Sequence, residues 1–99
     1  MAFSLVIDPR AIQDIQHAID YYDQQQAGLG IRFEATLNKH LLVLKKNPHF
    51  YLRYDQIRCL PLKKFPYMVH YTVDEDNSLI TIRAVFHTSV SPQKWENRK

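Results

Sequence analysis

Two helical patterns in direct succession constrain the fold of this 99-residue chain more than any other feature. The first covers residues 9–26, where Asp8 and Pro9 are of the types preferred at a helix N-cap and first turn. The second covers residues 31–46 and ends at Asn47-Pro48, because proline cannot continue the hydrogen-bond ladder. Each has one apolar stripe: Ile12, Ile15, Ile19 and Tyr22 in the first, and Phe33, Leu37, Leu41 and Leu44 in the second. Only residues 27–30 separate them, including two glycines free to take positive φ, which predicts an antiparallel helical hairpin.

Strand patterns flank this hairpin. One covers residues 3–7, and three more follow at residues 57–62, 67–73 and 80–87. In the last of these we expect Ile80, Ile82, Ala84 and Phe86 on the apolar face, and Thr81, Arg83, Val85 and His87 on the other. Residues 49–55 read as an irregular aromatic connection. The order predicts a two-layer α+β domain with an N-terminal strand, a helical hairpin and then a three-stranded antiparallel meander, whose second face is open.

The charged residues are divided unevenly along the chain. Residues 1–38 contain two basic and five acidic residues, whereas residues 39–99 contain eleven basic and five acidic ones. The asymmetry favours an acidic or phosphate-bearing partner for the second part of the chain. An ordinary solvated surface with unevenly placed lysine and arginine is the competing interpretation.

Cysteine content and hydropathy bear on the compartment. Cys59 is the only cysteine, which excludes an internal disulfide and favours a reducing environment. The N-terminus lacks the features of a signal peptide, and no apolar stretch approaches the roughly 20 residues that cross a bilayer. We therefore expect a soluble, cytoplasmic protein with no membrane partner and a single domain over residues 1–99, of which 88–99 form a tail. No metal or other cofactor is expected, because the histidines are scattered: His17, His40, His49, His70 and His87.

A series of short motifs runs along nearly the whole chain. The motifs are Asp20-Tyr-Tyr22, Gly28-Leu-Gly30 before Arg32-Phe33, Asn47-Pro48, Ile57-Arg58, Leu62 to Tyr67, Tyr71, and Ala84 to His87 followed by Pro92 and Trp95. In order and spacing they resemble the RelE/ParE superfamily of toxins from bacterial toxin–antitoxin pairs. The pattern is closer to the ParE-type, plasmid-stabilisation branch than to the RelE branch, which cleaves messenger RNA.

The resemblance implies a small growth-inhibiting toxin that a co-expressed antitoxin neutralises. ParE-like members bind DNA gyrase and are not known to do chemistry, whereas RelE-like members are metal-independent endoribonucleases that cut messenger RNA on the ribosome. We expect the gyrase-binding activity, with ribosome-dependent RNA cleavage or an inactive antitoxin-binding module as alternatives. A homodimer and a heterotetramer with the antitoxin both stay open.

Candidate functional residues lie in the basic second part of the chain. If the chain cleaves RNA, His87 would act as an acid or base and Arg83 would brace a phosphate. The two residues are four positions apart on one predicted strand, which would place them on the same face, about 13 Å from each other along the strand. The competing interpretation makes His87 a hydrogen-bonding anchor for the tail. For binding a target or nucleic acid the candidates are Arg58, Lys63, Lys64, Arg83 and Lys94. The pattern does not decide which face of its strand Arg58 occupies, because apolar residues occur on both: Leu60 on the same face as Arg58, and Cys59 on the other.

Overall fold

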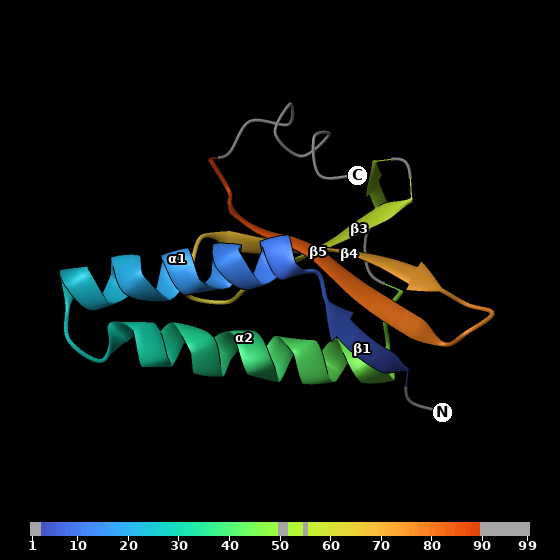
Figure 1. Ribbon diagram of the computed structural model, residues 1–99, viewed down its shortest axis with the longest axis horizontal. Helices are drawn as coiled ribbons and strands as arrows, with labels where there is room; N and C mark the ends of the chain where they lie inside the picture. Colours follow the sequence, from blue (N-terminus) through green and yellow to red (C-terminus); the bar gives the residue numbers. More distant parts are fainter. Residues whose placement is uncertain (1–2, 50–51, 55, 90–99) are drawn as a thin grey trace.

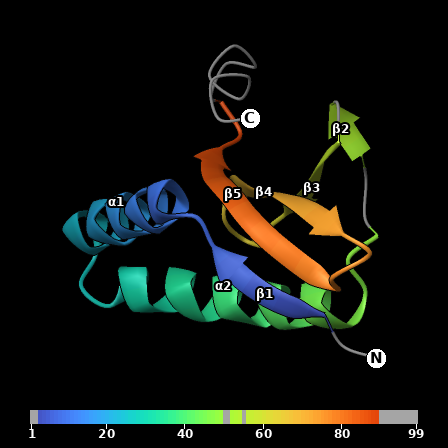
Figure 2. The same cartoon turned by 45° about the vertical axis from the view of Figure 1, so that its right-hand side comes forward.

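The computed structural model describes residues 3–49, 52–54 and 56–89. Its elements are β1 (Ser4–Ile7), α1 (Pro9–Gln25), α2 (Leu29–Lys46), β2 (Leu52–Tyr54), β3 (Ile57–Pro61), β4 (Tyr67–Asp74) and β5 (Leu79–His87). The strands form one sheet in the order β1-β5-β4-β3-β2. Strand β1 pairs parallel with β5, and the other pairs are antiparallel. Both helices lie on one side of the sheet (Figures 1 and 2), which confirms the predicted α+β class.

The helical hairpin forms as predicted, with a tighter connection. Asp8 caps α1 by accepting the backbone N–H of Arg10 at 2.8 Å, and Pro9 opens the helix. Gly28 takes φ 87° at the N-cap of α2, so that helix begins at Leu29, two residues earlier than predicted. Gly30 is therefore helical rather than part of the connection. It is buried against α1, where an added Cβ would lie 2.6 Å from the carbonyl oxygen of Ile19.

The core lies between the hairpin and the sheet. All four residues of the α2 stripe are buried, as the 3.6-residue periodicity predicted. In α1 the buried residues are Ala11 and Ala18, whereas Ile12, the first residue of the predicted apolar stripe, is 54% exposed. Ile15, Ile19 and Tyr22 of the predicted stripe are partly buried and pack against the core beside these alanines. From the sheet, Leu60, Val69, Tyr71, Ile80, Ile82 and Val85 join the same cluster.

A fifth strand lies where an irregular connection was expected. Leu52–Tyr54 forms β2, which pairs with β3 through a shifted register and extends the sheet at the edge remote from β1. The strand has three residues. That length is too short to produce a recognisable alternation, so the sequence pattern did not indicate it.

An extra residue in β5 changes which face its last residues occupy. Tyr71 pairs with Ile82 and His70 pairs with Ala84, so Arg83 is the extra residue of β5 between these two pairs. Such a β-bulge reverses the alternation beyond it, because side chains alternate with a period of two. Val85 consequently joins the core cluster, and Phe86 contacts His70 at 5.3 Å between ring centroids on the opposite face. The prediction that Phe86 lies on the apolar face with Ile80 and Ile82 was wrong for this reason.

The face opposite the helices is not bare along its whole length. Cys59, His70 and Ala84 stand side by side on β3, β4 and β5, and each is at most 2% exposed. The Sγ atom of Cys59 lies 3.5 Å from Nδ1 of His70. Aliphatic, aromatic and thiol groups therefore form a second, smaller buried cluster. The expected open face is limited to the parts of the sheet outside it.

Candidate functional site

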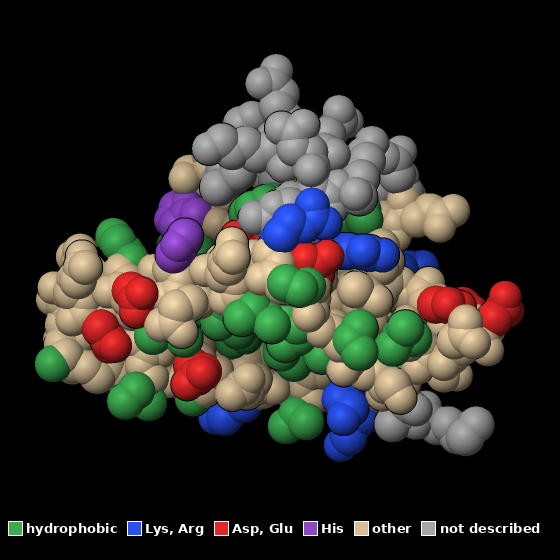
Figure 3. Space-filling model, viewed as in Figure 1, with side chains coloured by type: hydrophobic (Ala, Val, Ile, Leu, Met, Phe, Trp, Pro, Cys, Tyr) green, Lys and Arg blue, Asp and Glu red, His purple; other side chains and the backbone are tan. Residues whose placement is uncertain are grey.

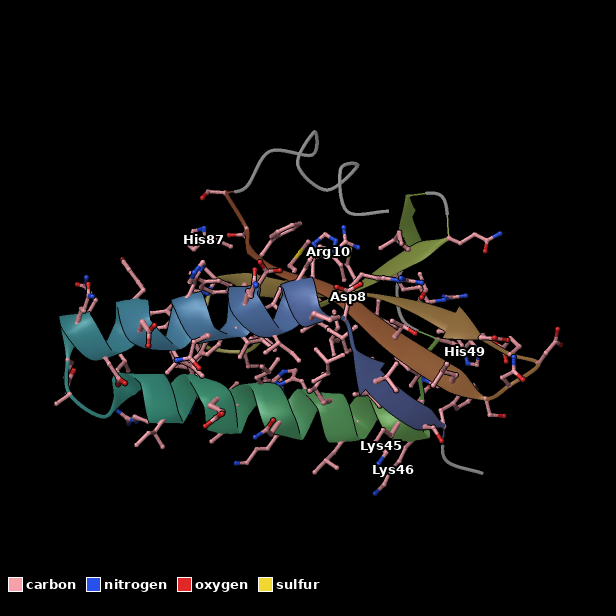
Figure 4. All side chains as sticks on the ribbon, viewed as in Figure 1. Asp8, Arg10, Lys45, Lys46, His49 and His87 are labelled. Carbon is pink, nitrogen blue, oxygen red and sulfur yellow. The ribbon has the colours of Figure 1, made fainter. Side chains whose placement is uncertain are left out.

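Arg83 lies on the sheet face opposite the helices, beside the start of α1. Its Nε donates to Oγ1 of Thr72 at 3.3 Å. The neighbouring Tyr71 points into the core on the helix side, so Thr72 points to the other face. Nearby, Arg10 pairs with Asp8 at 3.2 Å, as Figure 4 shows at the first turn of α1. The hydrogen bonds from Arg10 lower the pKa of Asp8, and the charge of Arg83 contributes in the same direction. Arg83 therefore lies near enough to the N-terminus of α1 for its charge to favour the ionised form of Asp8.

His87 lies on the helix side of the sheet, so it does not share a face with Arg83. It pairs across the strands with Tyr67, and the two rings contact edge to face at 5.2 Å between centroids. The backbone N–H of Ser89 donates to His87 Nδ1 at 3.0 Å, so the proton of the neutral ring is on Nε2. The bulge at Arg83 separates the two candidate catalytic residues. The expectation that Arg83 and His87 share one face was therefore wrong, and His87 forms hydrogen bonds with Ser89 in the turn that follows β5.

A hollow of about 330 Å³ lies between α1 and the end of β5, and His87 is part of its wall. Asp14, His17 and Tyr21 line it from α1, and Tyr67 lines it from β4. Figure 3 shows histidine side chains gathered on this part of the surface, above α1. Burial, and then the neighbouring Tyr21, raise the pKa of Tyr67. This group was not predicted from the sequence, although spacings of three and four residues place its α1 members on one helix face.

The same region closes the edge of β5. Strand β1 pairs with β5 only as far as Ile82, where the backbone N–H of Asp8 donates to the Ile82 carbonyl at 2.8 Å. Beyond that point Asp14 Oδ2 accepts the N–H of Val85 at 3.2 Å. A helix side chain therefore takes the place of a neighbouring strand for this amide. Asp14 fixes α1 against β5 and so fixes one wall of the hollow.

The basic candidates do not form one group. Lys63 and Lys64 are exposed in the loop between β3 and β4, whereas Arg58 pairs with Tyr71 and so lies on the helix side of the sheet. Arg83 lies on the other side. Lys94 and the rest of the predicted tail beyond residue 89 fall outside the described residues. The loop lysines are therefore the most accessible of the described candidates.

A second cavity, of about 400 Å³, lies between α2 and β3. Its wall is formed by Lys39, His40, Val43, Leu60, Pro61 and Lys63. Nδ1 of His40 lies 2.7 Å from the carbonyl oxygen of Thr36, and Nε2 lies 3.4 Å from the backbone nitrogen of Lys63. These contacts connect α2 to the loop that carries the lysines.

Within residues 3–49, 52–54 and 56–89, no three His, Cys, Asp or Glu side chains are grouped closely enough to bind a metal ion. In that same part of the structure, neither helix combines the length and apolar character that a membrane span requires.

A family model described as "ParE toxin of type II toxin-antitoxin system, parDE" matches residues 5–92. The chain belongs to the ParE toxin family. It is therefore a toxin of a type II toxin–antitoxin system, which confirms the RelE/ParE resemblance given by its motifs. No curated protein sequence matches the chain.

Solved structures of low sequence identity share the fold of this ParE-family chain. A chain of the chromosomal ParDE system from P. aeruginosa has a TM-score of 0.77 at 15% identity, with 87% of this chain and 96% of that chain covered. A mutant E. coli RelE toxin in the free state has a TM-score of 0.68 at 18% identity, covering 97% and 94%. A chain of the M. tuberculosis RelBE2 toxin–antitoxin complex has a TM-score of 0.65 at 16% identity, with 88% of this chain and 99% of that chain covered. Both branches of the superfamily have this architecture, so the fold alone does not select a cellular target.

Proposed function

We propose that this toxin arrests growth by binding DNA gyrase without doing chemistry itself, and that a cognate antitoxin neutralises it. The match to the ParE family supports this target class. The observation that favours binding over RNA cleavage is the bulge in β5, which separates Arg83 from His87. A phosphate brace and a proton-transfer group on opposite faces cannot act on one phosphodiester.

The proposed contact with the target centres on the loop between β3 and β4. Lys63 and Lys64 are exposed there, and Lys64 has φ 71°, a conformation that costs a non-glycine residue about 1–3 kcal/mol. Backbone hydrogen bonds hold the loop, from Leu62 N–H to the Tyr67 carbonyl at 2.9 Å and from Thr88 N–H to the Pro66 carbonyl at 2.8 Å. A rigid loop presents two cations in a fixed arrangement, which suits an acidic protein surface.

A gyrase supercoiling assay tests this proposal. Purified toxin is expected to inhibit supercoiling, and the double variant Lys63→Glu/Lys64→Glu to raise the half-inhibitory concentration by about tenfold or more, since each reversed charge contact costs on the order of 1 kcal/mol. The matched control is Lys45→Glu/Lys46→Glu, which reverses two adjacent charges at the end of α2 (Figure 4). Unimpaired supercoiling with the unaltered toxin would contradict gyrase as the target.

The hollow beside α1 favours one second candidate, ribosome-dependent cleavage of messenger RNA. In that reaction His17 accepts the proton of the 2′-hydroxyl, whose oxygen attacks phosphorus. His87 takes part as the imidazolium, donates one proton to the leaving 5′-oxygen as the P–O5′ bond breaks, and returns to the neutral ring. A translating ribosome system with end-labelled message separates this candidate from the first. Cuts that disappear in His17→Ala and in His87→Ala, but persist in the control His49→Ala, would replace gyrase binding by RNA cleavage. A chain that leaves growth unchanged without antitoxin would be an inactive antitoxin-binding module.

A further inference from the structure

The cavity between α2 and β3 combines apolar walls with a cationic rim. Val43, Leu60 and Pro61 supply the apolar part, and the charged part comes from Lys39 on α2 and Lys63 in the loop after β3. Its volume of about 400 Å³ is within the range of roughly 300–1,000 Å³ that is typical of ligand pockets. Such a site accepts an apolar group that carries negative charge beside it.

The wall of this cavity is fixed before any partner binds. Because the Thr36 carbonyl only accepts, Nδ1 of His40 carries the proton and donates at 2.7 Å, which leaves Nε2 as an acceptor for the Lys63 N–H at 3.4 Å. One neutral tautomer therefore satisfies both contacts and ties the Lys63 loop to α2. A partner does not spend binding free energy on ordering this side of the site.

The charge around the cavity selects the chemistry of its occupant. Both charged residues that line it, Lys39 and Lys63, are basic. Lys64, next to Lys63 in the same loop, is exposed. Complementary potentials therefore favour a negatively charged partner.

We propose that this cavity is an anchor site for the antitoxin: it receives one apolar side chain from an acidic segment of that protein, whose flanking carboxylates meet Lys39 and Lys63. The inference rests on the proposed function, because it takes the antitoxin as the partner. Lys63 also belongs to the loop assigned to the target. The bound antitoxin segment therefore covers part of the target surface, and neutralisation is competitive.

Two adjacent α2 residues provide a matched test. Val43 lines the cavity and is 50% exposed, whereas Leu42 is 60% exposed and does not line it. Binding of the full-length toxin to its own full-length antitoxin is measured by calorimetry. Val43→Asp is expected to raise Kd by about tenfold or more, because it places a charge in the apolar contact, and Leu42→Asp to raise it by less than about threefold. Circular dichroism melts establish that both variants are folded.

A charge-reversal pair provides the second test. Lys39→Glu is expected to weaken antitoxin binding and to reduce its salt dependence, whereas the control Lys46→Glu on the same helix has a smaller effect on both. Equal weakening by Val43→Asp and Leu42→Asp, or no weakening by Val43→Asp and Lys39→Glu, would overturn the assignment. The assignment would also be overturned if the NMR methyl signals of Val43 and Leu60 shifted on addition of decanoate, an apolar chain with one carboxylate, but not on addition of antitoxin. A self-association of the toxin that Val43→Asp abolishes would overturn it as well.

Growth measurements distinguish a failure of the anchor-site proposal from a failure of the gyrase proposal. Growth arrest by each variant is measured without antitoxin and then with it, so that lost toxicity is not mistaken for lost neutralisation. A toxin that leaves gyrase unaffected while Val43→Asp selectively weakens antitoxin binding would refute the gyrase proposal and leave the anchor site in place.

Discussion

Replacing Gly30 by alanine is expected to destabilise the toxin, although alanine is the better helix former. The built Cβ would lie 2.6 Å from the Ile19 carbonyl oxygen and 2.7 Å from Asp23 Oδ1, where ordinary contacts begin at 3.4 Å. Asp23 Oδ1 also accepts the Gly30 N–H at 2.8 Å. Because one of the crowded atoms is backbone, α1 and α2 must separate to admit the methyl group.

The expected magnitude follows from opposing contributions. Overpacking costs typically 1–3 kcal/mol, and a weakened hydrogen bond to the Asp23 carboxylate costs roughly 1 kcal/mol more. The higher helix propensity of alanine offsets about 1 kcal/mol of this. A net loss of about 2 kcal/mol in the free energy of unfolding remains. For a domain of this size that corresponds to a Tm lower by roughly 8–16 °C.

Urea and thermal unfolding monitored by circular dichroism measure this loss. The control is Ala35→Gly, an exposed position in the middle of the same helix, which is expected to cost about 1 kcal/mol from propensity alone. The two substitutions change the same pair of residue types in opposite directions. A Gly30→Ala protein as stable as the original, or more stable, would refute the close approach of the two helices at this point.

Three other outcomes are expected. Tyr71→Phe should lower the free energy of unfolding by about 1–3 kcal/mol in a urea titration, because the buried hydroxyl donates to the Pro48 carbonyl at 2.8 Å; an unchanged midpoint would contradict that bond. Asp8→Ala should cost about 1 kcal/mol at neutral pH through loss of the N-cap. Since Arg10 lowers the Asp8 pKa in the folded protein, that contribution is present above the ordinary value of 3.8 and is lost as the pH falls through the folded pKa, so a difference that persists in acid would disprove the link. Cys59, 2% exposed, should react with a thiol reagent only as fast as the protein opens, and rapid labelling in native buffer would contradict its burial.

Local sequence patterns predicted those parts of the fold that local interactions determine. The Asp8 cap depends on residues two positions apart, and the stripe of α2 depends on spacings within one helix. The alternation of β4 was likewise readable, because Val69 and Tyr71 face a single core. In each case the pattern and the burial have the same period.

The parts that the sequence did not predict depend on contacts between distant segments. Nothing near Arg83 marks a bulge, which is defined only by the pairing of β5 with β4. The two cavities likewise lie between elements that are distant in the sequence, α1 with β5 and α2 with β3. No local motif therefore marked His17 or Val43 as a lining residue. The separation of Arg83 from His87 therefore became visible only with the sheet register.

The extra residue in β5 also affects how this toxin can be matched to its relatives. A relative without the insertion would have its final strand residues turned the other way, so identical letters in aligned columns would end up on opposite sides of the molecule. For residues after Arg83, roles can be transferred between relatives only by superposing structures. For residues before Arg83, a sequence alignment is sufficient. A single deletion at that position would exchange the environments of Phe86 and His87 without altering either residue.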